Sequence, residues 1–148
     1  MRTSGNHYSV NILLIEDNPG DIRLTEEAFR KGEMLSKLNV AMDGEEGLKY
    51  LRKEDKYAGV ETPHIILLDL NLPKKDGRQV LAEIKACPKL KLIPVIVLTT
   101  SAAEQDIMSM YSLHANCYIT KPVDFKQFSN VVRSIENFWL SIVQLPGK

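Results

Sequence analysis

Cysteine, net charge and long apolar runs are all scarce in this chain of 148 residues. Its two cysteines, Cys87 and Cys117, form neither a CxxC pair nor a zinc-binding spacing with histidine, so we expect reduced thiols. Lys plus Arg and Asp plus Glu each number 19, which favours neither nucleic acid nor a membrane surface as a partner. No apolar run approaches the ~20 residues that span a bilayer, and residues 1–9 lack the apolar core of a signal peptide. We therefore expect a cytoplasmic protein.

The composition is that of one globular domain. The chain is 44% hydrophobic and 26% charged, and it is long enough for one sizeable core. It contains no internal repeat, low-complexity segment or linker between domains. We expect one folded domain over residues 10–143, preceded by a flexible lead-in at 1–9 and followed by a tail at 144–148.

Apolar stretches alternate with segments of helical periodicity. Residues 65–68 are all apolar and lie between Pro63 and Pro73, which is typical of a strand buried on both faces of a parallel sheet, although periodicity alone does not exclude a buried helix. The predicted strands are 10–15, 38–42, 65–68, 93–98 and 117–120. The predicted helices are 19–31, 45–54, one between Gly77 and Pro88, 103–114, and a strongly amphipathic one over 128–142.

This alternation predicts a single doubly wound α/β domain. Its five parallel strands would carry helices on both faces, joined by right-handed crossovers. The carboxyl ends of parallel strands share one edge of the sheet, and that edge is where ligands bind in open α/β folds.

Polar side chains follow four of the predicted strands, where each apolar run stops. They are Glu16 and Asp17, Asp69, Thr99, and Lys121. Taken singly, such residues are more often helix caps or exposed loop residues. Together at one edge, the crowded carboxylates would repel one another unless a cation such as Mg²⁺ shared their oxygens. A hydroxyl and an ammonium group beside that cation predict a site for a phosphoryl group.

These residues resemble the signature of bacterial response-regulator receiver domains along nearly the whole chain. The intervals of 30 residues from Asp69 to Thr99 and 52 from Asp69 to Lys121 are those of the family. The resemblance implies a flavodoxin-like receiver fold with strand order 2-1-3-4-5. The matching motifs are Glu16-Asp17, the stretch 67–73 with Asp76-Gly77, Thr99, and Lys121-Pro122 after Tyr118.

The resemblance also implies roles for single residues. Asp69 would accept a phosphoryl group from a sensor histidine kinase. Thr99 and Lys121 would bind the phosphoryl oxygens, with the backbone N–H of Thr100 as a further donor, and Thr99 and Tyr118 would switch the conformation. The implied Mg²⁺ ligands are Asp17, Asp69, the backbone carbonyl of Asn71, and Glu16 through water.

Residues 70–78, 116–121 and 138–140 further resemble stand-alone receivers that partner phytochrome histidine kinases. Such a chain has no room for an effector domain, so its signal would leave through a protein surface. We expect a homodimer through the face of the fourth and fifth helices and the C-terminal aromatic helix. The expected dimer contacts of that helix and its tail are Phe138, Trp139, Leu140 and residues 143–146.

Two other functions are compatible with parts of the pattern. A phosphohydrolase with an aspartyl nucleophile would share the α/β fold, but it needs a second acid two residues after the nucleophile, and this chain has Asn71 there. A degenerate receiver would act only as a binding module, yet all the phosphorylation residues are present. We therefore expect a phosphoacceptor signalling domain, which is no ordinary enzyme although it promotes its own phosphorylation and dephosphorylation.

Overall fold

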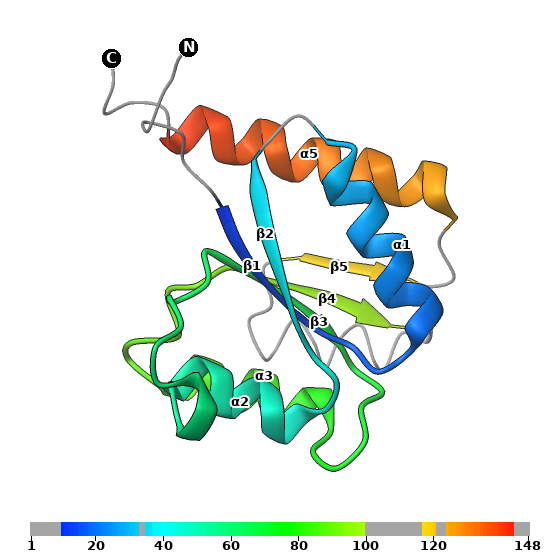
Figure 1. Ribbon diagram of the computed structural model, residues 1–148. Helices are drawn as coiled ribbons and strands as arrows, with labels where there is room; N and C mark the ends of the chain where they lie inside the picture. Colours follow the sequence, from blue (N-terminus) through cyan, green and yellow to red (C-terminus); the bar gives the residue numbers. More distant parts are fainter. Residues whose placement is uncertain (1–9, 33–34, 100–116, 121–123, 144–148) are drawn as a thin grey trace.

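The computed structural model describes residues 10–32, 35–99, 117–120 and 124–143. In this part of the chain, five parallel strands form one sheet in the order β2-β1-β3-β4-β5, which confirms the predicted fold (Figure 1). The predicted helix 103–114 lies outside the described residues. The strands are β1 (Val10–Ile15), β2 (Ser36–Ala41), β3 (Ile65–Asp69), β4 (Val95–Thr99) and β5 (Cys117–Thr120).

The bounds of three strands differ from the prediction, and β3 differs only in that it includes Asp69. β2 begins at Ser36 and ends before Met42, because backbone pairing with β1 sets its limits and the apolar pattern of this edge strand is weak. The side chain of Met42 is instead exposed. β4 begins at Val95, after Pro94, which lacks the N–H that a ladder requires.

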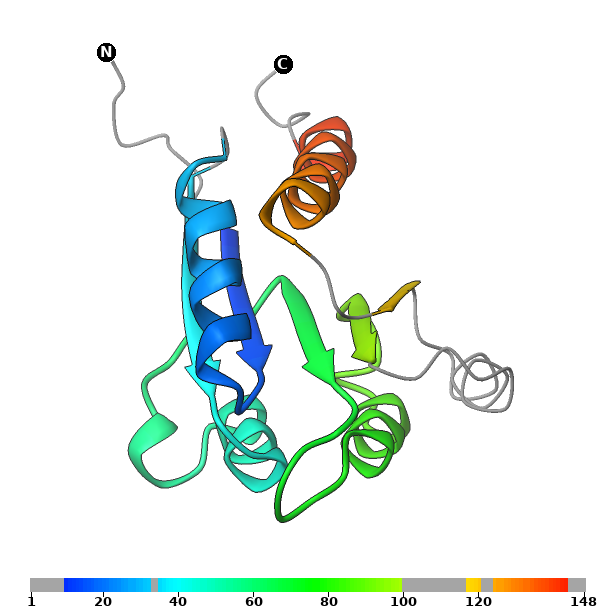
Figure 2. The same cartoon turned by 90° about the vertical axis from the view of Figure 1, so that its right-hand side faces the viewer.

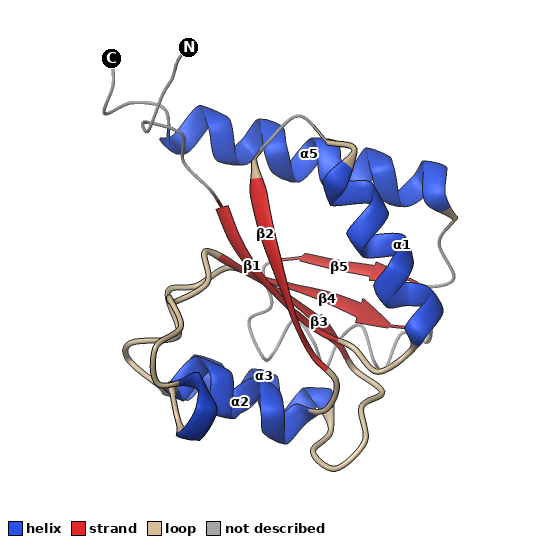
Figure 3. Cartoon of the chain, in the orientation of Figure 1, coloured by secondary structure: helices blue, strands red, loops and turns tan. Residues whose placement is uncertain are grey.

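Helices cover both faces of the sheet, as predicted. α1 (Pro19–Arg30) and α5 (Phe125–Val143) lie on one face, and α2 (Gly44–Arg52) and α3 (Gly77–Ala86) lie on the other (Figures 1 and 2). A short 3₁₀ helix, η2 (Asp55–Tyr57), follows α2 (Figure 3). None of the helices in the described residues is long and apolar enough to cross a membrane.

Short polar side chains begin the helices, as local chemistry requires. Asn18 accepts a hydrogen bond from the backbone N–H of Asp21 at 2.9 Å, and Asp43 accepts one from Glu46 at 2.8 Å. Asp124 precedes α5 and exchanges two hydrogen bonds with Gln127, a capping box. Each cap satisfies backbone donors that the first helical turn leaves open.

Alternate residues of β1 enter two different cores. Ile12 and Leu14 pack toward α1 and α5, whereas Leu13 and Ile15 pack toward α2 and α3. All four are fully buried, which at about 1.5–3 kcal/mol per large apolar side chain makes β1 a major contributor to stability. The sheet therefore holds its strand ends in fixed positions.

A charged network fixes the loop between β3 and α3. Glu83 on α3 accepts hydrogen bonds from Arg52 Nη2 on α2 and from Lys75 Nζ in the loop, both at 2.7 Å. The hydrogen bond from Lys75, followed by that from Arg52, holds the pKa of Glu83 below its usual value. The three groups connect two helices with the segment that leaves β3.

We expect Glu83→Gln to lower the free energy of unfolding at pH 7 by about 0.5–1 kcal/mol, a small value because all three groups are partly solvated. The pKa of Glu83 is lower in the folded chain, so its contribution is present above the unfolded pKa and is lost as pH falls through the folded pKa. Urea unfolding measured from pH 7 down to about pH 3 should show that the free energies of unfolding of wild type and variant become equal as the pH falls. Glu54→Gln, at an exposed position with no ion pair in the described chain, is the control. If the free energies of unfolding of wild type and Glu83→Gln differed by the same amount at every pH, the stabilising role of the charged Glu83 carboxylate would be contradicted.

Candidate metal centre

The sheet brings the ends of β1, β3 and β4 to one edge. Ile15 pairs with Leu68, so Glu16 and Asp69 follow at the same level of neighbouring strands. Asp69 in turn pairs with Leu98, and Thr99 ends β4 one residue later. The shared carboxyl edge that the sequence predicts is thus present, and Asp69 lies on its central strand.

Three carboxylates converge at this edge. Oxygen atoms of Glu16, Asp17 and Asp69 all lie within 4.8 Å of one another. Glu16 is fully buried and Asp69 is 4% exposed, whereas Asp17 is partly open to solvent. Carboxylates this close repel one another, and a hard divalent cation with oxygen ligands relieves the repulsion. The donor set and its one solvent-facing member fit such an ion, with water completing its shell.

Backbone contacts hold the segment after Asp69 against the sheet. The N–H of Asn71 donates to Asp69 Oδ1 at 3.2 Å, and the N–H of Leu70 donates to the carbonyl of Leu98 at 3.0 Å. The N–H of Gly77 donates to the carbonyl of Leu70, also at 3.0 Å. Backbone hydrogen bonds therefore hold both ends of the loop that carries Asn71, beside the carboxylates.

Two glycines, Gly44 and Gly77, permit the close approach of this loop. A Cβ at Gly77 would lie 2.6 Å from Leu70 Cα and closer still to the carbonyl oxygen of Asp69. A Cβ at Gly44 would meet the carbonyl of Lys75. Each glycine directly follows a helix-capping Asp, so the sequence marks the start of a helix at both positions. That neither position has room for a Cβ is visible only in the folded structure.

The remaining predicted site residues are placed only in part. Thr99 is 2% exposed at the end of β4 and pairs with Thr120 of β5. Lys121, the next residue, lies outside the described residues, as does Thr100. The backbone of Tyr118 pairs with Val97, but its side chain is not described. The acid cluster and Thr99 are brought to one edge, while the positions of Lys121 and the Tyr118 ring stay predictions.

The arrangement of these residues agrees with the match of the sequence to one protein family. Residues 12–133 match the response regulator receiver domain. The chain belongs to this family. The match begins within β1, spans the other four strands and includes Glu16, Asp17, Asp69 and Thr99.

Two relatives of similar length resemble this receiver along most of its length. Response regulator Rcp1 of Synechocystis is 48% identical over 136 residues, which cover 92% of each chain. The probable methanogenesis regulatory protein FilR2 of Methanothrix harundinacea is 40% identical over 136 residues, covering 92% of this chain and 87% of that protein.

Solved structures of response regulators, among them a phytochrome response regulator, have the same fold. The phosphorylated cyanobacterial phytochrome response regulator RcpA superposes with a TM-score of 0.84 at 51% identity, covering 92% of this chain and 97% of that one. The Mn²⁺-bound form of Rcp1 gives a TM-score of 0.82 at 47% identity, covering 90% and 96%. The predicted family and its resemblance to phytochrome-associated receivers are thus confirmed.

Proposed function

We propose that this chain is a stand-alone receiver that accepts a phosphoryl group on Asp69 in a Mg²⁺-dependent reaction. The convergence of Glu16, Asp17 and Asp69 is the observation that carries the proposal. Metal-bound and phosphorylated forms exist among its relatives, in Rcp1 and RcpA respectively. The family assignment and the acid cluster thus support the same chemistry from independent directions.

The reaction assigns a separate task to each residue at the edge. A carboxylate oxygen of Asp69 attacks the phosphorus of a phosphohistidine, the P–N bond breaks, and an acyl phosphate forms on Asp69. Asp17, Asp69 and the carbonyl of Asn71 would hold Mg²⁺ directly and Glu16 through water, and the ion would supply positive charge against the phosphoryl oxygens. Thr99 and Lys121 would bind those oxygens, and Thr99 with Tyr118 would report the modification as a change of conformation.

Asn71 argues against the alternative of a phosphohydrolase. It is two residues after Asp69, where such a hydrolase needs an acid to transfer protons. Its backbone N–H instead donates to Asp69 Oδ1 and so helps to orient the nucleophile. The chain should therefore keep its acyl phosphate longer than a hydrolase would, and act as a signal carrier.

The phosphoryl donor is proposed to be a sensor histidine kinase of the phytochrome type, because the similar protein RcpA is a phytochrome response regulator. A purified phytochrome kinase, labelled on its histidine, should transfer most of its label to this chain within minutes when Mg²⁺ is present. An unrelated histidine kinase serves as the control. Equal transfer from both kinases would contradict the phytochrome assignment, and transfer from neither would contradict the receiver function.

We further propose the bounds of the domain, its oligomeric state and its cellular compartment. The receiver domain is proposed to span residues 10–143 and the cytoplasm to be its compartment. A homodimer through the fourth-helix and fifth-helix face would let phosphorylation alter a protein surface, and we propose no contact with nucleic acid. The supporting feature is α5, 19 residues long, whose later part carries Phe138, Trp139 and Leu140, side chains outside the described residues.

A further inference from the structure

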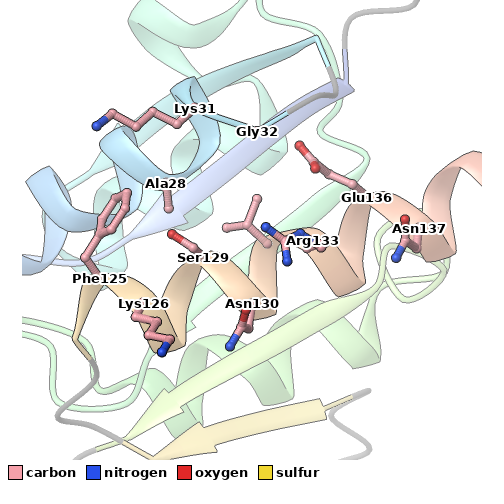
Figure 4. A pocket seen from close by; sticks show the side chains of 11 residues that line it. Ala28, Lys31, Gly32, Phe125, Lys126, Ser129, Asn130, Arg133, Glu136 and Asn137 are labelled. Atoms are coloured by element: carbon pink, nitrogen blue, oxygen red, sulfur yellow. The ribbon is translucent and has the colours of Figure 1, made fainter.

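A pocket of about 580 Å³ lies between the C-terminal end of α1 and the first three turns of α5 (Figure 4). None of the residues of the acid cluster lines it. Its volume is within the range of small-molecule sites, about 300–1,000 Å³. The receiver chemistry proposed above assigns no role to this pocket. The lining that the argument uses comprises Lys31 of the α1 end and Phe125, Lys126, Ser129, Arg133 and Glu136 of α5.

The charge of the pocket is predominantly positive. Lys31, Lys126 and Arg133 are exposed, and none of them forms an ion pair with an acid in the described part of the chain. The acid in the lining, Glu136, is 5% exposed, and its carboxylate is turned toward Gly32 (Figure 4). Three solvated cations around one buried acid favour an anionic ligand.

Many other cations of the described chain, unlike these three, form ion pairs. Arg30, Lys49, Arg52, Lys74 and Lys75 each lie within 4.0 Å of a carboxylate oxygen. The pocket thus gathers three cations that form no ion pair with an acid of the described residues. A phosphoryl group would pair with Arg133, because a guanidinium binds two of its oxygens at once, and the two lysines make the rest of the pocket positive.

One end of the pocket is aromatic. Phe125 is 39% exposed, and Lys31 Nζ lies 5.5 Å from the centre of its ring. Figure 4 shows Ser129 between Phe125 and Arg133 along α5, so a hydroxyl group separates the aromatic end from the guanidinium. A ligand that fits has a planar ring for Phe125, with Lys31 beside that ring, and phosphoryl groups for Arg133.

We propose that this pocket binds a nucleotide, with its base against Phe125 and its phosphoryl groups at Arg133, while Lys31 and Lys126 add positive charge at the aromatic end. The bound nucleotide would bridge α1 and α5, two helices that pack on the same face of the sheet. It would therefore stabilise the folded chain by mass action, without occupying the phosphoacceptor edge.

The test is a titration of the full chain with ADP, followed by amide NMR shifts in EDTA so that no metal recruits the nucleotide to the acid cluster. Saturable shifts should appear at Lys31, Gly32 and the first three turns of α5. Arg133→Gln should weaken binding about tenfold, as expected for loss of a charge-assisted contact. Arg23→Gln is the matched control, since Arg23 is exposed on α1 but does not line the pocket; it should leave the affinity unchanged.

Two further probes separate the halves of the ligand. Adenosine and pyrophosphate should each bind more weakly than ADP. Phe125→Leu should lower the affinity for ADP and leave the affinity for pyrophosphate unchanged. Equal affinity for pyrophosphate and ADP would overturn the nucleotide assignment. So would the absence of saturable shifts up to about 5 mM ADP, a concentration that detects even millimolar binding, or shifts confined to Glu16, Asp17 and Asp69.

Discussion

Asp69→Asn is expected to abolish phosphorylation of the chain by acetyl phosphate and Mg²⁺. The amide lacks the negative charge and nucleophilicity of the carboxylate, while its oxygen can still accept the hydrogen bond from the N–H of Asn71. The fold should therefore persist, and removing one of three crowded charges should make the metal-free variant no less stable than wild type. Phosphate-affinity electrophoresis and mass spectrometry measure the label directly.

The control for this variant is Asp55→Asn, the same chemical change in the 3₁₀ helix η2. Asp55 is exposed and pairs with Lys49 at 3.7 Å, outside the acid cluster. This variant should be labelled at the wild-type rate. Full labelling of Asp69→Asn would show that another residue is the phosphoacceptor.

Gly77→Ala is expected to lower the free energy of unfolding by about 1–3 kcal/mol, the usual effect of inserting a methyl group into a filled space. The new Cβ would lie 2.6 Å from Leu70 Cα and 2.9 Å from the Leu70 carbonyl oxygen, both of them backbone atoms. Alanine favours a helix by about 1 kcal/mol, which offsets only part of this cost at the first residue of α3. Urea unfolding followed by circular dichroism measures the change.

Gly59→Ala makes the same substitution in open space, since a Cβ there meets nothing within 4 Å. Its stability should stay within about 0.5 kcal/mol of wild type. The loop displaced by Gly77→Ala also carries Asn71, so that variant should in addition be phosphorylated more slowly. Wild-type stability and rate for Gly77→Ala would mean that the loop adjusts freely and does not position Asp69.

Much of the fold could be predicted because the buried strands are apolar throughout. The six residues of β1 and the five of β3 and β4 are all buried, so composition and length alone located these strands. Edge strand β2 was displaced by two residues at its start, because its polar residues follow the backbone ladder of β1 and not an apolar pattern. Prediction was thus most accurate for β1 and β3, whereas β4 begins two residues later than its apolar run because Pro94 lacks the N–H that the ladder requires.

The candidate site was predictable for a different reason. Residues that follow parallel strands meet at one edge, so Glu16, Asp17 and Asp69 could be brought together from topology alone. The supports of the site could not be found this way. The link from Glu83 to Lys75 and the close contact at Gly77 join segments whose spacing depends on the path of the loop, which no periodicity encodes.

Metal binding at the acid cluster is tested most directly by Mn²⁺ line broadening in amide NMR spectra of the metal-free chain. Substoichiometric Mn²⁺ should broaden the signals of Glu16, Asp17, Asp69 and Asn71 first, excess Mg²⁺ should restore them, and Asp69→Asn should weaken the effect. Broadening centred elsewhere, or none at these four residues, would contradict the proposed metal-dependent phosphoacceptor site.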